Sequence, residues 1–318
     1  MTRTYIALPD AVVVASDGDV RRTLDRTGPQ CLAVDPSTTG RVYCGTWDRG
    51  VFRSDDAGET WTPLGHEQAT PVAVGANGVV YVGTEPSALH RSDDAGASWT
   101  ECTAMTHVES APTWSFPPRP YTSHVRWITP DPDVRDRLFV CIEAGALLRS
   151  LDGGETWEDR RPDGPIDTHT LVAAGGRLYS AAGDGFMLPG CGFSVSSDAA
   201  ETWKRPDDGL QDHYLWGLAV DGSDPETVVV SAAPSPFDAH GEQGAESTIY
   251  RRSRGGEWTE VLDGLPPRAG TNAAVLTWHD GVFYGASNRG LFRSDDGGSS
   301  WRHMLDLDGR AQALVVTN

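Results

Sequence analysis

The sequence predicts an all-β fold, a seven-bladed β-propeller with four antiparallel strands in each blade. The first observation is a repeated motif with the core Ser-x-Asp-x-Gly-x-(Ser/Thr)-Trp, because an element that recurs every few tens of residues is typical of a repeat architecture. Its clear copies are residues 53–61, 91–99, 149–157 and 293–301, with a weaker copy at 195–203 and a shortened one at 252–258. The second observation is that no long stretch has apolar residues at helical spacing, in a chain with 36 Gly and 21 Pro. Short strands joined by turns are therefore favoured.

Each motif copy closes a unit of four short strands. In the first unit, residues 31–64, we expect strands at 31–34, 41–46, 50–54 and 60–64, with Gly, Asp and Asn in the turns. The next five units cover residues 71–102, 124–160, 168–206, 214–261 and 272–304. We expect all of them to belong to one domain, residues 1–318.

The two chain ends are left over from these six units. Aligned with the first unit, residues 4–25 supply the second, third and fourth strands of a blade, and residues 312–318 supply its first strand. We therefore expect a seventh blade built from both ends, which leaves no open strand edge between the first and the last blade.

The repeated motif resembles the Asp-box, or bacterial neuraminidase repeat (BNR), and the resemblance covers nearly the whole chain. Such propellers occur in sialidases, in sortilin-type receptors, in hydrolases that act on cellulose and xyloglucan, and in photosystem II assembly factors. The resemblance implies the fold but not an activity, because the family contains both enzymes and pure binding proteins. In the motif turn we expect Asp56 and its counterparts to accept backbone N–H bonds, Gly58 and its counterparts to adopt positive φ, and the Trp residues to pack between blades.

The charge balance bears on partners and source. The chain has 26 basic and 45 acidic residues, a net charge of −19, and only one lysine, Lys204. Nucleic acids and anionic membranes both require a basic surface, so we expect neither as a partner. An acidic surface nearly free of lysine resembles proteins of salt-loving archaea, which predicts a halophilic protein from a haloarchaeon, although a genome rich in G and C would also favour arginine.

We expect a cytoplasmic monomer. The N-terminus has no apolar segment of secretory length, and no run of about 18 apolar residues could form a membrane helix. The five cysteines lack metal-type spacing, so we expect them to be reduced and mostly buried. They are Cys31, Cys44, Cys102, Cys141 and Cys191.

A functional site is expected on the face opposite the motif turns. That face receives the irregular insertions 103–123, 183–192 and 233–247, and long loops on a rigid scaffold are where binding residues concentrate. Alignment of the first strands also places a ring of side chains at the mouth of the channel. The ring is Gln30, Thr70, Arg126, His169, Trp216, Ala273 and Gln312.

Our main hypothesis is a binding or assembly module that holds a protein or a saccharide ligand on this face. The candidate ligand-binding residues are aromatic or polar and lie near strand ends or in the insertions. They are Trp47, Asp48, Arg49, Trp114, Tyr121, Arg126, Tyr214, Trp216, Asp238, His240, Asn288 and Arg289.

The alternative is a hydrolase of the glycosidase type, or a lyase, at the channel mouth. Glycoside hydrolysis requires two carboxylates about 5 to 9.5 Å apart, and Glu143, Asp184 and Glu85 are the candidates. In so acidic a chain, carboxylates near any point are also expected by chance. A sialidase is disfavoured, because we find no Arg-Ile-Pro motif near the N-terminus and sialidase propellers have six blades.

No cofactor is required by the sequence, but one metal hypothesis remains open. His124, His169 and His213 come from three consecutive predicted blades. If their imidazoles converged, they could hold a divalent transition metal with open coordination positions. The other interpretation is that each histidine caps a loop carbonyl.

Overall fold

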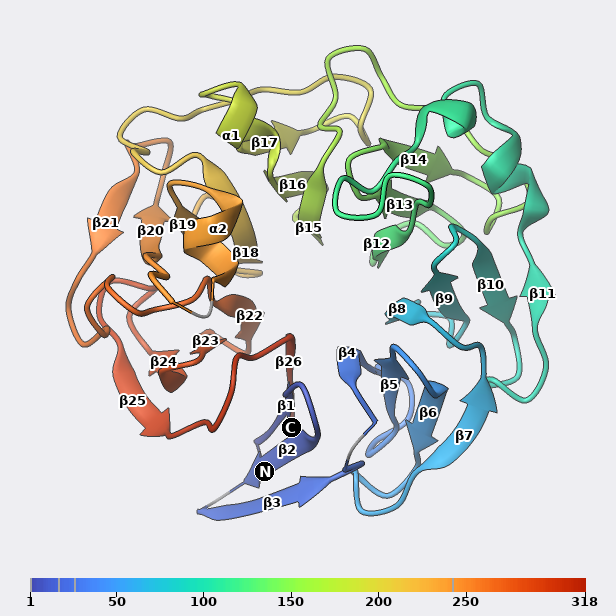
Figure 1. Ribbon diagram of the computed structural model, residues 1–318, viewed down its shortest axis with the longest axis horizontal. Helices are drawn as coiled ribbons and strands as arrows, with labels where there is room; N and C mark the ends of the chain where they lie inside the picture. Colours follow the sequence, from blue (N-terminus) through green and yellow to red (C-terminus); the bar gives the residue numbers. More distant parts are fainter. Residues whose placement is uncertain (1, 17, 26, 242) are drawn as a thin grey trace. The chain divides into compact units, whose positions relative to one another are not determined.

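The protein is a seven-bladed β-propeller, as the sequence predicts. The computed structural model describes residues 2–16, 18–25, 27–241 and 243–318, whose strands form seven antiparallel sheets (Figure 1). The chain divides into two compact units, Met1–Thr168 with Thr317–Asn318 and His169–Val316, and each unit is described by itself below.

Three blades lie entirely in the first unit. They are β4 (Pro29–Val34), β5 (Val42–Thr46), β6 (Gly50–Ser54) and β7 (Thr62–Gly65); β8 (Ala69–Val74), β9 (Val80–Thr84), β10 (Leu89–Ser92) and β11 (Thr100–Glu101); and β12 (Val125–Pro130), β13 (Leu138–Ile142) and β14 (Ala146–Ser150). Two short 3-10 helices, η1 (Thr103–His107) and η2 (Ala111–Thr113), follow β11. The first strands β4, β8 and β12 are neighbours in this order, so the loops at their ends come together (Figure 1).

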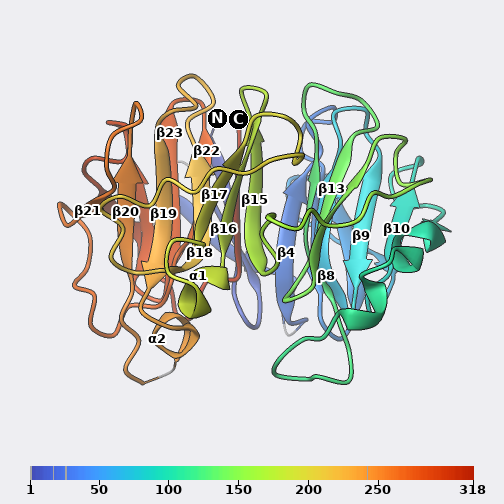
Figure 2. The same ribbon diagram turned by 90° about the horizontal axis from the view of Figure 1, so that it is seen from above.

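The second unit contributes three further blades. They are β15 (Thr168–Ala174), β16 (Arg177–Ala182) and β17 (Phe193–Ser196); β18 (Tyr214–Val220), β19 (Val228–Ala233), β20 (Thr248–Arg252) and β21 (Thr259–Val261); and β22 (Val275–His279), β23 (Val282–Ser287), β24 (Gly290–Ser294) and β25 (Arg302–Leu305). Two short helices, α1 (Asp184–Met187) and α2 (Pro236–His240), both contact β18 and lie along one edge of this unit (Figure 2).

The remaining sheet is built from both chain ends, as predicted. Its strand order is β26 (Ala313–Thr317), β1 (Arg3–Ala7), β2 (Val12–Ser16) and β3 (Asp19–Thr23). Tyr5 and Ile6 of β1 are fully buried, as expected for an inner strand.

Two of the seven sheets depart from the prediction because they have three strands instead of four. In the sheets β12–β14 and β15–β17, single bridges between Arg149 and Glu158 and between Val195 and Lys204 replace the fourth strand. Pro206, two residues after Lys204, has no N–H for a continued ladder. After Glu158 the chain turns away, since the Asp159 carboxylate accepts hydrogen bonds from the backbone N–H and the hydroxyl of Ser110.

The motif turns have the hydrogen bonds that the sequence predicts. In the first of them, Ser54 Oγ accepts a 2.7 Å bond from the Gly58 N–H and donates to Asp56 Oδ1 at 2.8 Å. Asp56 Oδ1 also accepts a 2.8 Å bond from the Thr60 N–H, and Gly58 has φ of 83°. The same serine–aspartate pairing recurs at Ser92–Asp94, Ser150–Asp152, Ser196–Asp198 and Ser294–Asp296.

Arginines tie these turns to the neighbouring blade, a role that the sequence did not predict. Arg53 on β6 donates a 2.7 Å hydrogen bond to the carbonyl of Ala95, the positive-φ residue in the motif turn of the next blade. Arg251 on β20 does the same to Gly297 at 2.6 Å. The motif turn is thus both a local cap and a contact between blades.

No helix among the described residues is long and apolar enough to cross a membrane.

Candidate functional site

Four of the first strands carry a β-bulge at the predicted ring position. The pairing register shifts between Pro29 and Cys31, Ala69 and Val72, Val125 and Trp127, and Leu215 and Leu218. The bulges therefore contain Gln30, Thr70, Arg126 and Trp216. A bulge redirects a side chain and interrupts the ladder, and bulges are frequent beside active sites. Neighbouring side chains use the carbonyls at these bulges, since Thr70 Oγ1 donates to Val125 O at 2.6 Å and Thr170 Oγ1 to Trp216 O at 2.8 Å.

Charged and aromatic side chains gather where three blades of the first unit end. We call the following set the first-unit cluster: Trp47 after β5, Glu85 after β9, Phe116 and Arg119 in the loop after η2, His124 and Arg126 at β12, and Glu143 after β13.

Glu85 and Arg119 form a bidentate ion pair in this cluster. Arg119 Nε and Nη2 donate to the two oxygens of Glu85 at 2.8 and 2.7 Å, a bidentate pair that is among the strongest hydrogen-bond arrangements in proteins. The Glu85 side chain is only 6% exposed, and its hydrogen bond raises the pKa of the Arg119 guanidinium above the ordinary value. The guanidinium also lies 4.9 Å from the Trp47 ring centre and 4.7 Å from that of Phe116.

His124 lies between two carboxylates. Its Nε2 is hydrogen-bonded to Glu143 Oε2 at 2.9 Å, and its Nδ1 is 3.3 Å from Glu85 Oε2, although without the alignment of a hydrogen bond. One imidazole ring thus contacts both carboxylates, with Glu85 at Nδ1 and Glu143 at Nε2. Arg126 Nε lies 3.5 Å from Glu143 Oε2, and the edge of Phe116 packs on His124.

The other predicted residues of this unit have different surroundings. Asp48 and Arg49 are exposed in the turn between β5 and β6. Trp114 is half-buried, donates from Nε1 to Ser110 Oγ at 3.0 Å and packs against the core. Tyr121 is 85% exposed, so its ring is presented to solvent.

A second set, the second-unit cluster, surrounds the start of β18. It consists of His169, Tyr214, Trp216 and His240, which the sequence predicted, and of Arg310, which it did not. Tyr214 Oη is hydrogen-bonded to His240 Nε2 at 3.0 Å, and the Trp216 ring lies 4.2 Å from His240 and 4.8 Å from His169. The Arg310 guanidinium lies 5.4 Å from the Trp216 ring centre.

Several predicted residues of the second unit are bonded to nearby backbone or cap a helix. Asp238 accepts a hydrogen bond from the hydroxyl of Ser235, the N-cap of α2. Asn288 bonds Asn272 N–H and Gly270 O, and Arg289 bonds Ala269 O, so both hold the connection that leads to β22. Asp184 opens α1, and His213 directly precedes β18.

Of the three histidines of the metal hypothesis, His124 lies in the first unit, and His169 and His213 lie in the second. In the first unit, the ring nitrogens of His124 face Glu143 and Glu85. In the second unit, His169 Nδ1 is hydrogen-bonded at 2.7 Å to the carbonyl of Leu215, which lies in strand β18 and not in a loop.

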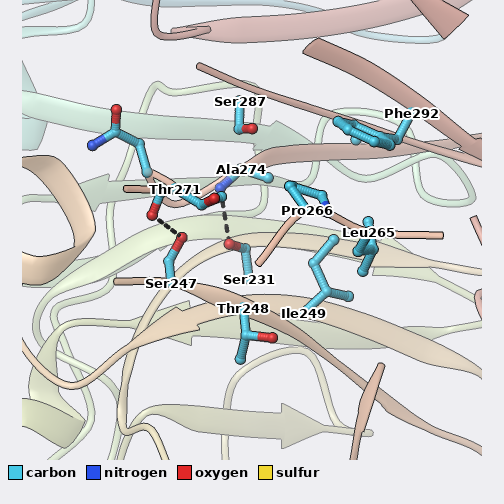
Figure 3. Close-up of a pocket in the computed structure, with 12 residues that line it drawn as sticks. Ser231, Ser247, Thr248, Ile249, Leu265, Pro266, Thr271, Ala274, Ser287 and Phe292 are labelled. Carbon is cyan, nitrogen blue, oxygen red and sulfur yellow. Dashed lines mark hydrogen bonds between the residues drawn. The ribbon is translucent and has the colours of Figure 1, made fainter. Parts of the chain in front are cut away.

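A small cavity in the second unit is too small for a sugar. Its volume is about 30 Å³, and its hydroxyl groups serve backbone contacts: Ser231 Oγ accepts from Ala274 N–H and Ser247 Oγ donates to Thr271 O (Figure 3). This volume suits one or two water molecules. The cavity therefore belongs to the packing of the connection between β21 and β22.

Sequence reasoning missed three residues near the first-unit cluster, Phe116, Arg119 and Asp167. Asp167 Oδ1 accepts a 2.9 Å bond from the N–H of Ala144, next to Glu143. The sequence feature that could have pointed to Arg119 is a single arginine between two prolines, in an insertion rich in aromatic residues. In so acidic a chain nothing singled out Asp167.

Comparison with known proteins supports a propeller with relatives that act on polysaccharides. No family model matches the chain. A xyloglucanase from a Paenibacillus species is 27% identical over 295 residues, covering 77% of this chain and 28% of that protein. The solved structure of a GH74 enzyme from Niastella koreensis is 20% identical with a TM-score of 0.68, covering 96% of this chain and 56% of that one. The structure of YCF48 bound to D1 peptide is 15% identical with a TM-score of 0.62, covering 95% and 89%. The chain thus spans less than two thirds of each of the first two proteins.

Proposed function

We propose that this propeller acts on a saccharide, as a glycoside hydrolase-like protein whose reacting centre is the first-unit cluster. The observation that carries the proposal is the pair of carboxylates, Glu85 and Glu143, on either side of His124. Glu85 is occupied by Arg119, so the more exposed Glu143 is the carboxylate that a substrate reaches more easily. The sequence similarity to a xyloglucanase supports this assignment.

The cluster contains the parts that glycoside hydrolysis requires. One carboxylic acid protonates the leaving glycosidic oxygen, while a second carboxylate on the opposite face of the sugar either deprotonates the attacking water or itself attacks the anomeric carbon. Glu143 takes the first role, with its orientation fixed by His124 and Arg126. Tyr121, which is 85% exposed, supplies aromatic surface for sugar rings.

Replacement of Glu143 tests this function. Glu143→Gln keeps the shape of the side chain but cannot transfer a proton, so we expect release of reducing ends from xyloglucan or barley β-glucan to fall by a factor of about 100 or more. Glu155→Gln, an exposed change in a motif turn, is the control and should leave activity intact. Full activity in Glu143→Gln, with an unchanged melting temperature, would remove Glu143 from the mechanism.

The second candidate function is a binding or assembly module for a protein or a glycan. Two exposed aromatic side chains favour it, Tyr121 in the first unit and Phe237 in the second, at 85% and 80% exposure. The similarity to a propeller of nearly the same length that binds a peptide is consistent with it. Under this function, Tyr121→Ala or Phe237→Ala should abolish partner capture, while Glu143→Gln should not.

We further infer that the repeat belongs to the Asp-box group and that the protein is a halophilic, cytoplasmic monomer. The shared hydrogen bonds of five motif turns support the first inference, and the net charge of −19 supports a halophilic protein. Molar KCl should then raise the melting temperature, because it screens repulsion between carboxylates.

The metal hypothesis remains a prediction about His124, His169 and His213. The metal content of tag-free protein purified without chelator tests this hypothesis. A stoichiometric transition metal that is lost in His169→Ala would support it.

A further inference from the structure

We propose that the tip of the loop after η2, residues 115–123, is a lid over a sugar-binding subsite formed by Trp47 and by Glu85, one carboxylate of the proposed reacting pair. Arg119 fills that subsite in the closed state, and a ligand must displace it. We call these nine residues the lip. The proposal rests on the proposed function in one respect, because the ligand is taken to be a saccharide.

The lip is a self-contained loop. The hydrogen bonds of its described backbone N–H groups run within it: Phe116 N–H donates to Thr122 O at 2.8 Å, Arg119 N–H to Phe116 O at 2.8 Å and Thr122 N–H to Arg119 O at 3.1 Å. Three prolines, at 117, 118 and 120, restrict its backbone further. A loop bonded to itself in this way keeps its shape when it moves, so it can swing as one body about its ends.

Side chains hold the lip in place. Arg119 makes the bidentate pair with Glu85, Phe116 packs with its edge on His124, and Ser123 Oγ accepts a 2.9 Å bond from Ser87 Oγ. The Arg119 side chain is 36% exposed, so water can compete for its ion pair. A ligand can replace these side-chain contacts without changing the strands beneath the lip.

The surface beneath the lip suits a sugar ring. A pyranose places its C–H face on an aromatic ring and donates hydroxyl protons to a carboxylate. Trp47 offers the ring and Glu85 the carboxylate, and the Arg119 guanidinium uses both, since it lies over Trp47 at 4.9 Å and donates two hydrogen bonds to Glu85. Arg119 therefore imitates the two contacts that a bound sugar would make.

The position of this subsite gives it a role in the proposed reaction. Glu85 contacts the same imidazole as Glu143, so a sugar on Trp47 and Glu85 would lie next to the proposed reacting carboxylate. With the lip open, a sugar can reach Trp47 and Glu85 beside Glu143, and with the lip closed Arg119 occupies these positions. The lip therefore controls access of a saccharide to the pair of carboxylates.

The test is whether a saccharide binds more tightly or more weakly once the Arg119 side chain is removed. Arg119→Ala leaves the subsite unfilled, and the apparent affinity of a ligand rises when the competent state becomes more populated. With cellotetraose or a xyloglucan oligosaccharide as probe, calorimetry should show binding tightened by about tenfold, and Trp47→Ala in the same background should reverse the gain. Arg135→Ala, an exposed arginine between β12 and β13, is the matched control and should change nothing. If the wild type binds the probe, equal or weaker binding by Arg119→Ala would overturn the proposal.

A second measurement is independent of any saccharide. Acrylamide quenching of the Trp47 fluorescence should increase in Arg119→Ala because the lip opens. The Trp47 signal is the difference between each protein and its Trp47→Phe counterpart. If quenching increases but no oligosaccharide binds either protein, the lid stands and the proposed function fails. If quenching is unchanged, the lid is refuted whatever the protein binds.

Discussion

Single aspartates fix the geometry of the motif turns through charged hydrogen bonds. The pKa of Asp94 is lowered from its ordinary 3.8 to about 2, chiefly by the hydrogen bond from the Ser98 hydroxyl and then by that from the Ser98 N–H. The pKa values of Asp56 and Asp198 are lowered to about 2 for the same reason. Because the folded state binds the proton less well than the unfolded chain, these residues stabilise the fold above about pH 4, and this contribution is lost as the pH falls through about 2.

This linkage predicts the pH dependence of a single variant. Asp94→Asn should lower the melting temperature at pH 7, where the charged turn is fully formed, and should make the fall in melting temperature between pH 4 and pH 2 shallower than in the wild type. Thermal unfolding at a series of pH values measures both effects. Asp19→Asn, exposed on β3, is the control. If the melting temperatures of wild type and Asp94→Asn fell in parallel as the pH is lowered, Asp94 would not stabilise the turn through its charge.

At the scale of the element, the sequence predicted the strands better than the site. The motif recurs where the third strand turns into the fourth, so the blades could be placed along the chain from the repeat alone. The shortened blade β12–β14 could not, because Asp159 leaves the strand to bond Ser110, which lies in a preceding insertion. The bulge positions agree with the predicted ring, yet the sequence did not show that a lip would bring Arg119 onto Glu85. That contact joins residues 34 apart through an irregular loop, and no periodicity encodes it.

The connections between blades have little room for a side chain. At Gly264, with φ of 73°, a Cβ atom would lie 1.6 Å from the carbonyl oxygen of Trp301. Gly281 has a similar φ of 83° but nothing within 4 Å of that position. Gly264→Ala should therefore lower the free energy of unfolding by at least about 2 kcal/mol more than Gly281→Ala, which carries only the backbone strain. Denaturant midpoints measure the difference, and equal midpoints would show that the connection can shift.

At the scale of the whole molecule, the blade made from both chain ends is the feature on which the fold depends. β26 lies beside β1 in that sheet, and its Leu314 and Val316 side chains are buried. Without β26, β1 becomes an open strand edge, which favours aggregation.

Truncation at residue 311 should therefore lower the melting temperature by several degrees and promote association in size-exclusion chromatography. Leu314→Ala, which keeps the chain length, should cost about 2 kcal/mol or more if the strand is packed as described. A truncated protein that melts at the wild-type temperature and stays monomeric would show that the two ends do not close the fold.

Recognition of saccharides by the propeller is tested most directly by calorimetric titration of the Glu143→Gln protein with oligosaccharides of xyloglucan and barley β-glucan. This variant should bind without turning the ligand over, so a saturable heat with at least one of these probes is the result that we predict. If the protein is folded but releases no heat with any probe, the saccharide function is contradicted. A protein partner that binds the exposed aromatic residues would then be favoured.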